Sequence, residues 1–157
     1  MTRAELEAAI ASYGAGLEAE LSLLRQLDAL AVRERQASLS DDLELVTRIS
    51  DERTRLMAGL LIVENGIKPL RPLLSAHRQA AESLPGFDAV LALHRVASRL
   101  VNTILSADEE TLRILHDAAA ARRDALAAIE QGGQTLSAYR RVISPPVSNA
   151  ALFESRG

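Results

Sequence analysis

The amino-acid sequence predicts an all-α protein: an elongated antiparallel helical hairpin or coiled coil, a third long helix and a flexible C-terminal tail. Three observations support this fold class. Apolar residues recur along most of the chain at spacings of three, four and seven, the periodicity of amphipathic helices. No segment has the alternating pattern of a strand. Ala and Leu supply most of the 48% apolar content, and only 3% of residues are aromatic, a composition that suits helices packed along narrow seams.

The first predicted helix begins after Thr2 and runs to about Gln36. Thr2 with Glu5 three residues later is a capping-box pattern, which marks a helix start. Gly14 and Gly16 are expected to weaken this helix locally, at roughly 1 kcal/mol each relative to Ala. The apolar seam has a period near 3.5 residues and consists of Leu6, Ile10, Tyr13, Leu17, Leu21, Leu24 and Ala31. Charged side chains expected to lie off this seam are Glu7, Glu18, Glu20 and Arg25.

Residues 38–42, Ser-Leu-Ser-Asp-Asp, predict a polar turn and the start of a second helix. Ser and Asp cap helices, and the acidic pair Asp41-Asp42 favours the positive end of the helix dipole. The predicted seam of this helix is interrupted by Glu52 and consists of Leu45, Ile49, Leu56, Leu60, Val63, Ile67 and Leu70. Because a short turn joins the two helices, we expect an antiparallel hairpin.

Two prolines, Pro69 and Pro72, are predicted to end or bend the second helix, and a short helical piece follows through His77. The residues Leu84-Pro-Gly86 then mark a firm break before the next helix.

The third long helix is predicted to start near Phe87 and to end at Ser144-Pro-Pro146. Its predicted seam is thin, with Ala and charged residues at several positions: Val90, His94, Ala97, Val101, Ile104, Asp108, Leu112, Leu115, Ala119, Arg122, Leu126 and Ile129. We therefore expect residues 1–143 to form a single helical domain and residues 144–157 to form the flexible tail.

Composition argues against several classes of function. The absence of Cys excludes disulfides, thiolate metal sites and cysteine nucleophiles. No segment approaches the ~20 apolar residues of a membrane span, and no secretory signal is recognisable, so we expect a cytoplasmic protein without membrane insertion. The net charge is −3, and acidic and basic residues are interspersed rather than gathered into a basic stripe. Nucleic acid is therefore not an expected partner.

No catalytic, metal or cofactor site is expected. None of the three His residues has the spacing of a helical metal site, and Gly14-Ala-Gly16 lies within a helix without a preceding strand. The acidic pairs at 41–42 and 109–110 are better explained as a helix cap and a solvated face. A small all-helical enzyme similar to chorismate mutases is the weaker alternative. It would need several converging cations, whereas Lys68 is the only lysine.

The segment from Arg33 to Leu56 resembles the helix–turn–helix of the FlgN-like flagellar export chaperones. That family has an acidic short turn followed by a helix of the form L-x-x-[IL]-x-x-E-[KR]-x-x-L, and Leu45, Ile49, Glu52, Arg53 and Leu56 stand close to that form. The ending Leu152-Phe-Glu-Ser-Arg-Gly157 is similar to the family's terminal L-Y-x-x-x-G, with Phe153 in place of the tyrosine.

This resemblance implies a cytoplasmic chaperone for flagellar type III export. Such a protein binds the helical terminus of hook-associated proteins, which form the hook–filament junction, and delivers them to the export gate. We assign docking on the export gate to Leu152 and Phe153. The resemblance implies this role, and Phe153 is an aromatic anchor on a tail that has little apolar area of its own.

The thin seam of the third helix predicts where a client binds. A seam that the fold does not saturate leaves apolar surface for a client helix. The predicted client-binding residues are Leu112, Leu115, Leu126 and Ile129. The chief alternative is a coiled-coil adaptor or homo-oligomeric scaffold, in which this seam closes on a copy of itself.

Overall fold

The computed structural model describes the backbone of residues 1–145 and the side chains of residues 1–142. The described chain is all-α, as predicted, and contains no strand between residues 1 and 145. Its helices are α1 (Arg3–Leu39), α2 (Leu43–Ile67), α3 (Leu70–Ala76), α4 (Arg78–Ala81) and α5 (Phe87–Pro145). The chain divides into unit 1, residues 1–114, and unit 2, residues 115–157, so that α5 contributes residues to both.

The start of α1 has the predicted capping box. The Glu5 amide donates to the Thr2 hydroxyl oxygen at 3.2 Å, and the Thr2 amide donates to the Glu5 carboxylate at 2.7 Å. All seven predicted seam residues of α1 are buried, and so are Ala9, Leu27, Leu30 and Ala37. The buried surface of α1 is therefore wider than one seam, because helices pack on two of its sides. The helix ends at Leu39, three residues beyond the predicted end, a difference typical of helix termini.

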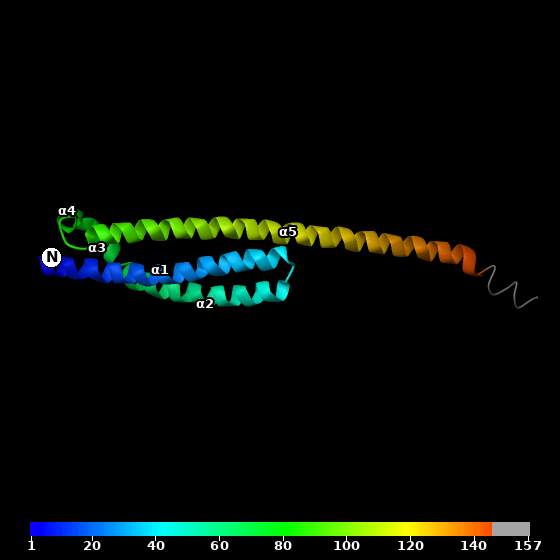
Figure 1. Ribbon diagram of the computed structural model, residues 1–157, viewed down its shortest axis with the longest axis horizontal. Helices are drawn as coiled ribbons and strands as arrows, with labels where there is room; N and C mark the ends of the chain where they lie inside the picture. Colours follow the sequence, from blue (N-terminus) through cyan, green and yellow to red (C-terminus); the bar gives the residue numbers. More distant parts are fainter. Residues whose placement is uncertain (146–157) are drawn as a thin grey trace, which may run out of the picture. The chain divides into compact units, whose positions relative to one another are not determined.

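In unit 1, α1 lies between α2 and the first part of α5 (Figure 1). The start of α1 packs against Phe87 and Val90, and its middle packs against Ala97 and Ile104, so this part of α5 runs parallel to α1. Ile67, at the end of α2, joins the cluster at the start of α1, so α2 runs antiparallel to it. The predicted hairpin and the third helix packed along it are thus confirmed for unit 1.

The turn between α1 and α2 has the predicted acidic cap. The side chain of Asp42 accepts a hydrogen bond from the amide of Leu45 at 3.1 Å. Asp41 has a φ of 55°, in the left-handed region that Asp tolerates better than most residues. The break at the other end of the bundle is also as predicted, because Gly86 has a φ of 88° directly before α5.

The predicted seam of α5 is wrong at three positions within unit 1, whereas the predicted Asp108 is partly buried. Residues seven apart are buried as predicted, at Val90, Ala97 and Ile104. Between and beyond them, Leu93 and Leu100 pack against the buried clusters that include α1, and Ala107 and Ile114 are partly buried. The residues predicted instead, His94, Val101 and Leu112, are exposed. From Val90 onward, the observed seam advances by three residues and then by four, whereas the predicted seam advances by four residues and then by three.

The seam of α2 also needs one correction. Glu52, predicted to interrupt it, is exposed, and the next residue, Arg53, takes that place. Arg53 donates to both carboxylate oxygens of Asp108 at 2.8 Å and to Glu34 at 3.1 Å, with only 17% of its side chain exposed. One guanidinium therefore connects α2 to α1 and α5. Its hydrogen bonds to Asp108 raise the pKa of Arg53 above its usual value.

Replacing Arg53 by Met should lower the free energy of unfolding by about 2–3 kcal/mol, because Glu34 and Asp108 would be left partly buried without their shared cation. Arg48→Met is the control. Arg48 pairs with Glu44 one turn away at the surface, so the loss should stay below about 0.5 kcal/mol. Urea denaturation of both variants measures the difference. Equal losses would show that the Arg53 cluster contributes no more than a surface pair.

Gly16 was expected to weaken α1, but it is needed for packing. A Cβ atom at Gly16 would lie 2.1 Å from the Cγ2 atom of Ile67 at the end of α2. The two helices therefore approach each other more closely here than any larger residue allows. The cost of a glycine within the helix is offset by this contact.

Gly16→Ala should lower the free energy of unfolding by about 1–3 kcal/mol, because Ile67 must move out of its position. Gly59→Ala is the matched control, since its Cβ would lie at an ordinary 3.7 Å from Leu23. This control should raise stability by up to about 1 kcal/mol through helix propensity. Thermal denaturation of the two variants provides the test, and a Gly16→Ala protein as stable as the parent would contradict the close approach.

Candidate functional site

The predicted client-binding residues fall in both units. Leu112, in unit 1, is exposed, and Leu115, in unit 2, is partly buried. Leu126 and Ile129 are exposed at 57% and 71%. The two predicted docking residues, Leu152 and Phe153, lie outside the described residues.

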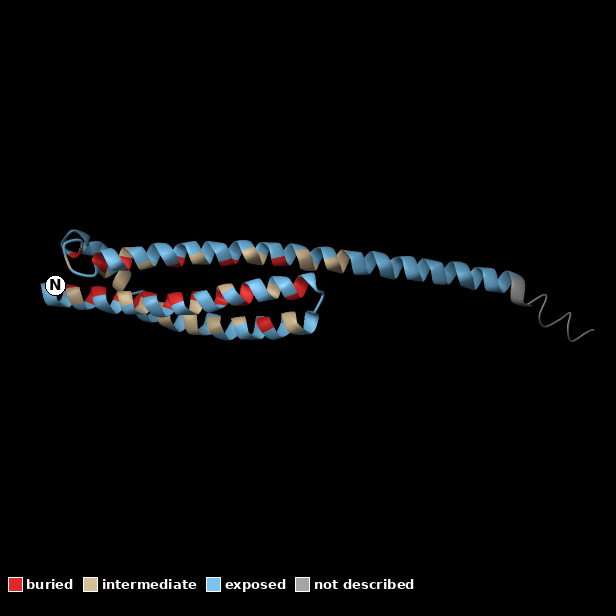
Figure 2. Ribbon diagram, viewed as in Figure 1, coloured by how far each residue is buried: buried red, intermediate tan, exposed pale blue. Residues whose placement is uncertain are grey.

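Unit 2 carries an uncovered apolar face on α5. Leu126, Ile129 and Leu136 stand three and seven residues apart, so they lie on one side of the helix, and each is more than half exposed. We call these three residues the distal face. Figure 2 shows that every described side chain from 121 onward is exposed. Large apolar side chains in this arrangement are typical of a surface that another helix covers.

Unit 1 contains a second candidate surface, a groove of about 530 Å³. Its floor is formed by α1, its walls by α2 and α5, and Arg71 of α3 stands at one end. We call it the Glu20 groove, and its remaining lining residues are Leu17, Leu24, Leu60, Leu61, Glu64, His94, Ala97, Ser98, Val101 and Asn102. His94, predicted to lie on the seam of the third helix, is exposed at its edge.

Glu20 is the feature of this groove that the sequence interpretation misplaced. It was expected off the seam of α1, but it is 7% exposed, and its Oε1 atom finds no hydrogen-bond donor among the described residues. Burial, followed by the hydrogen bond and charge of Glu64, raises the pKa of Glu20 from 4.5 to about 7, while Arg71 opposes the shift. The periodicity contained the signal, because Glu20 stands seven residues from both Tyr13 and Leu27, which are buried.

Arg71 organises the polar end of the groove. Its guanidinium binds both carboxylate oxygens of Glu64, with 2.7 Å between Nη2 and Oε2, and its Nε donates to the Tyr13 hydroxyl at 3.0 Å. These bonds lower the pKa of Glu64 to about 2 and raise that of Arg71. Arg71 thus directs all three of its nitrogens to Tyr13 and Glu64.

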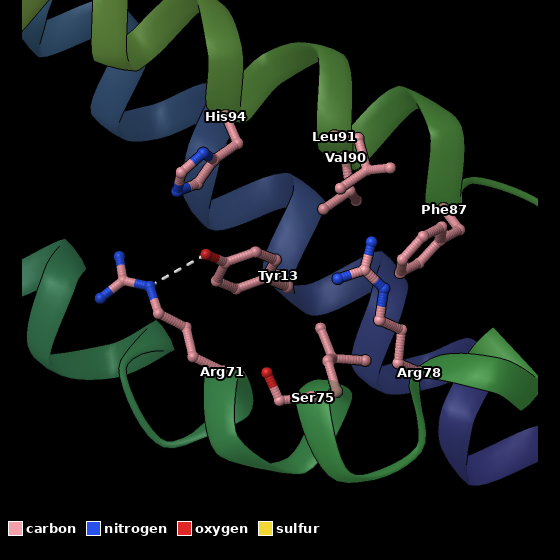
Figure 3. Close-up of a pocket in the computed structure, with 9 residues that line it drawn as sticks. Tyr13, Arg71, Ser75, Arg78, Phe87, Val90, Leu91 and His94 are labelled. Atoms are coloured by element: carbon pink, nitrogen blue, oxygen red, sulfur yellow. Dashed lines mark hydrogen bonds between the residues drawn. The ribbon is translucent and has the colours of Figure 1, made fainter. Parts of the chain in front are cut away.

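A smaller hollow adjoins the groove, and Arg71 and His94 line both (Figure 3). In Figure 3 the Tyr13 hydroxyl points toward Arg71, and Phe87, Val90 and Leu91 come from α5. The side chain of Arg71 also lies 5.9 Å from the Tyr13 ring centroid, within the range of a cation–π contact.

In the described part of the chain, no group of three or more His, Asp or Glu side chains is placed to hold a metal ion. None of the helices there combines the length and the apolar character of a membrane span.

Comparisons of the chain with protein-family models, with curated proteins and with solved structures find no match.

The carboxyl pair makes stability depend on pH. Because folding raises the pKa of Glu20 from 4.5 to about 7, the folded chain holds a proton that the unfolded chain releases across this window. The free energy of unfolding should therefore fall as pH rises from about 4.5 to 7. Glu64, whose pKa is lowered to about 2, acts in the opposite direction, and its contribution changes only below pH 4.5.

Glu20→Gln should remove most of the loss in stability between pH 5 and pH 8, which is on the order of 2 kcal/mol for a buried carboxyl with this shift. Chemical denaturation at intervals across this range measures it. Glu18→Gln, two residues away and exposed, is the control and should keep the slope of the parent. An unchanged slope in the Glu20 variant would assign the pH dependence to another group.

Proposed function

We propose that this protein is a cytoplasmic chaperone of flagellar type III export, which binds the helical terminus of hook–filament junction proteins and delivers them to the export gate. The observation that carries the proposal is the distal face of α5. Leu126 and Ile129 expose more than half of their surface on a described helix. The resemblance of residues 33–56 and 152–157 to FlgN-like chaperones names the client class.

The physical properties of the distal face suit this role. A secreted protein that is held for export keeps a terminal segment without a folded partner, and such a segment becomes helical when it meets an apolar helix face. Anchors at spacings of three and seven on α5 match the spacing of anchors on a client helix. The face has no buried polar group to satisfy, so binding and release cost little desolvation of charge.

The proposal assigns different tasks to two parts of the chain. Leu115, Leu126 and Ile129, which all lie in unit 2, bind the client. Leu152 and Phe153, outside the described residues, dock on the export gate as an aromatic anchor does. The proposed role requires neither a catalytic residue nor a cofactor.

The double variant Leu126→Glu with Ile129→Glu should weaken binding of a hook-associated protein's helical terminal segment roughly a hundredfold, because two apolar anchors are replaced by charges. Isothermal titration calorimetry with that segment and the full chain gives the affinities. Helicity and melting temperature should not change, because both residues are exposed. Ile62→Glu on α2, exposed at 73%, is the matched control and should bind like the parent.

Two outcomes would contradict the chaperone proposal. A chain that binds no hook-associated segment has no such client. A stable homo-oligomer that the double variant dissociates would indicate the scaffold alternative, in which α5 closes on a copy of itself. Sedimentation velocity of the chain alone, and with the segment at equal concentration, separates this from a one-to-one complex.

A further inference from the structure

The shape of the Glu20 groove can accommodate one more helix. In unit 1, α2 and α5 both pack on α1, and each turns a second apolar column away from it. On α2 this column is Met57 and Leu61, and on α5 it is Val101 and Leu105, four residues apart in each case and all exposed. Two columns on either side of a groove can both be covered by a fourth helix, which would complete a four-helix bundle.

The floor of the groove adds a chemical requirement. Glu20 is more than nine-tenths buried, and Oε1 is without a hydrogen-bond donor among the described residues. Buried carboxylate oxygens in this condition are costly, and a cationic or hydrogen-bonding group that reaches them is favoured. The walls around it, including Leu60, Leu61 and Val101, are apolar and make no hydrogen bond to it.

The charges that face Glu20 determine the sign of the missing group. Glu64 from α2 adds a second carboxylate, and Arg71 from α3 is the one guanidinium in the groove lining. Arg71 already directs its nitrogens to Glu64 and to Tyr13 of α1. His94 from α5 lines the groove, and Lys68 acts on Glu64. Glu20 and Glu64 share a hydrogen bond that holds one proton between them, and Arg71 is bound to Glu64, so a further cation at Glu20 would take the place of that proton.

We infer that the Glu20 groove binds an amphipathic partner helix that carries one Arg or Lys among its apolar anchor residues. The apolar anchors cover the columns of α2 and α5, and the cation approaches the carboxyl group of Glu20, which lines the groove. This inference concerns a surface separate from the distal face and does not depend on the flagellar role. A cation binds the ionised form of Glu20, so affinity rises with pH through the range in which Glu20 loses its proton.

The test uses the full chain and a set of synthetic amphipathic helical peptides with Leu at positions i, i+3, i+4 and i+7. In each peptide one apolar-face position is replaced in turn by Arg, Gln or Glu. Fluorescence anisotropy at pH 8 should find one position at which Arg binds about tenfold tighter than Leu, as a charge-assisted hydrogen bond predicts. This preference should shrink at pH 6.

Two variants assign the preference to the groove. Glu20→Gln keeps the side-chain shape and should remove the preference for Arg while leaving the binding of the all-Leu peptide in place. Val101→Glu should abolish binding of all the peptides, whereas Val96→Glu, equally exposed at 39% and outside the groove lining, should not. Circular dichroism and melting temperature verify that each variant is folded.

Several results would overturn the inference. They are a set of peptides without any preference for Arg, a preference that survives Glu20→Gln, and binding that Val101→Glu does not affect. Sedimentation of the chain alone tests the other occupant. A dimer that Val101→Glu dissociates would show that a second copy fills the groove. Loss of client binding in the distal-face variant alone leaves the inference unchanged, so the two proposals fail separately.

Discussion

Unit 1 depends on the burial of α1 on two of its sides. The chain has few aromatic residues, so no single side chain covers a large area, and stability must come from many Leu, Ile and Ala contacts along the helix. Ile10, Leu17 and Leu27 are almost completely covered. Each of the neighbouring helices needs only one face to do this. The faces of α2 and α5 that do not contact α1 stay free, and the groove beside Glu20 lies between these two helices.

Seams of Leu and Ala specify position poorly, because a shift by seven residues restores most contacts. Two local features of this protein supply the missing specificity. The close approach of Gly16 to Ile67 is possible at one register of α1 against α2. The Arg53 guanidinium, held by Asp108 and Glu34, satisfies its hydrogen bonds in one arrangement of three helices. Both features act through geometry that apolar burial alone does not provide.

Much of this fold could be predicted from the sequence because helix caps and apolar periodicity are local signals. The capping box at Thr2, the Asp42 cap and the start of α5 at Phe87 all lie where the residues indicated. On α5, the buried positions Val90, Ala97 and Ile104 were predicted correctly, and the positions between them were not. The residues three and four positions after each of these include apolar side chains in both cases, so the sequence does not distinguish them. Only the position of α1 decides that Leu93 and Leu100 face inward while His94 and Val101 do not.

The polar part of the groove was harder to predict for a different reason. A charged residue is normally assigned to the surface, and Glu20 was placed there although its spacing from Tyr13 and Leu27 put it in the buried column. Its partners Glu64 and Arg71 come from two other helices, α2 and α3, so the pattern of α1 does not indicate them. The role of Gly16 was hidden in the same way, because propensity describes one helix and the contact needs two.

The two candidate surfaces differ in the features by which they can distinguish one partner helix from another. The distal face presents Leu126, Ile129 and Leu136 to solvent, and an apolar helix face distinguishes partners mainly by the spacing and size of their anchors. A mismatch of one methylene there changes the affinity by only about 1 kcal/mol. The groove adds a buried carboxylate oxygen, and a partner that leaves such an atom without a donor forfeits more than a lost apolar contact costs. Under the two proposals, Glu20 would select between two helices of equal apolar pattern, whereas the distal face would bind many amphipathic helices with similar affinity.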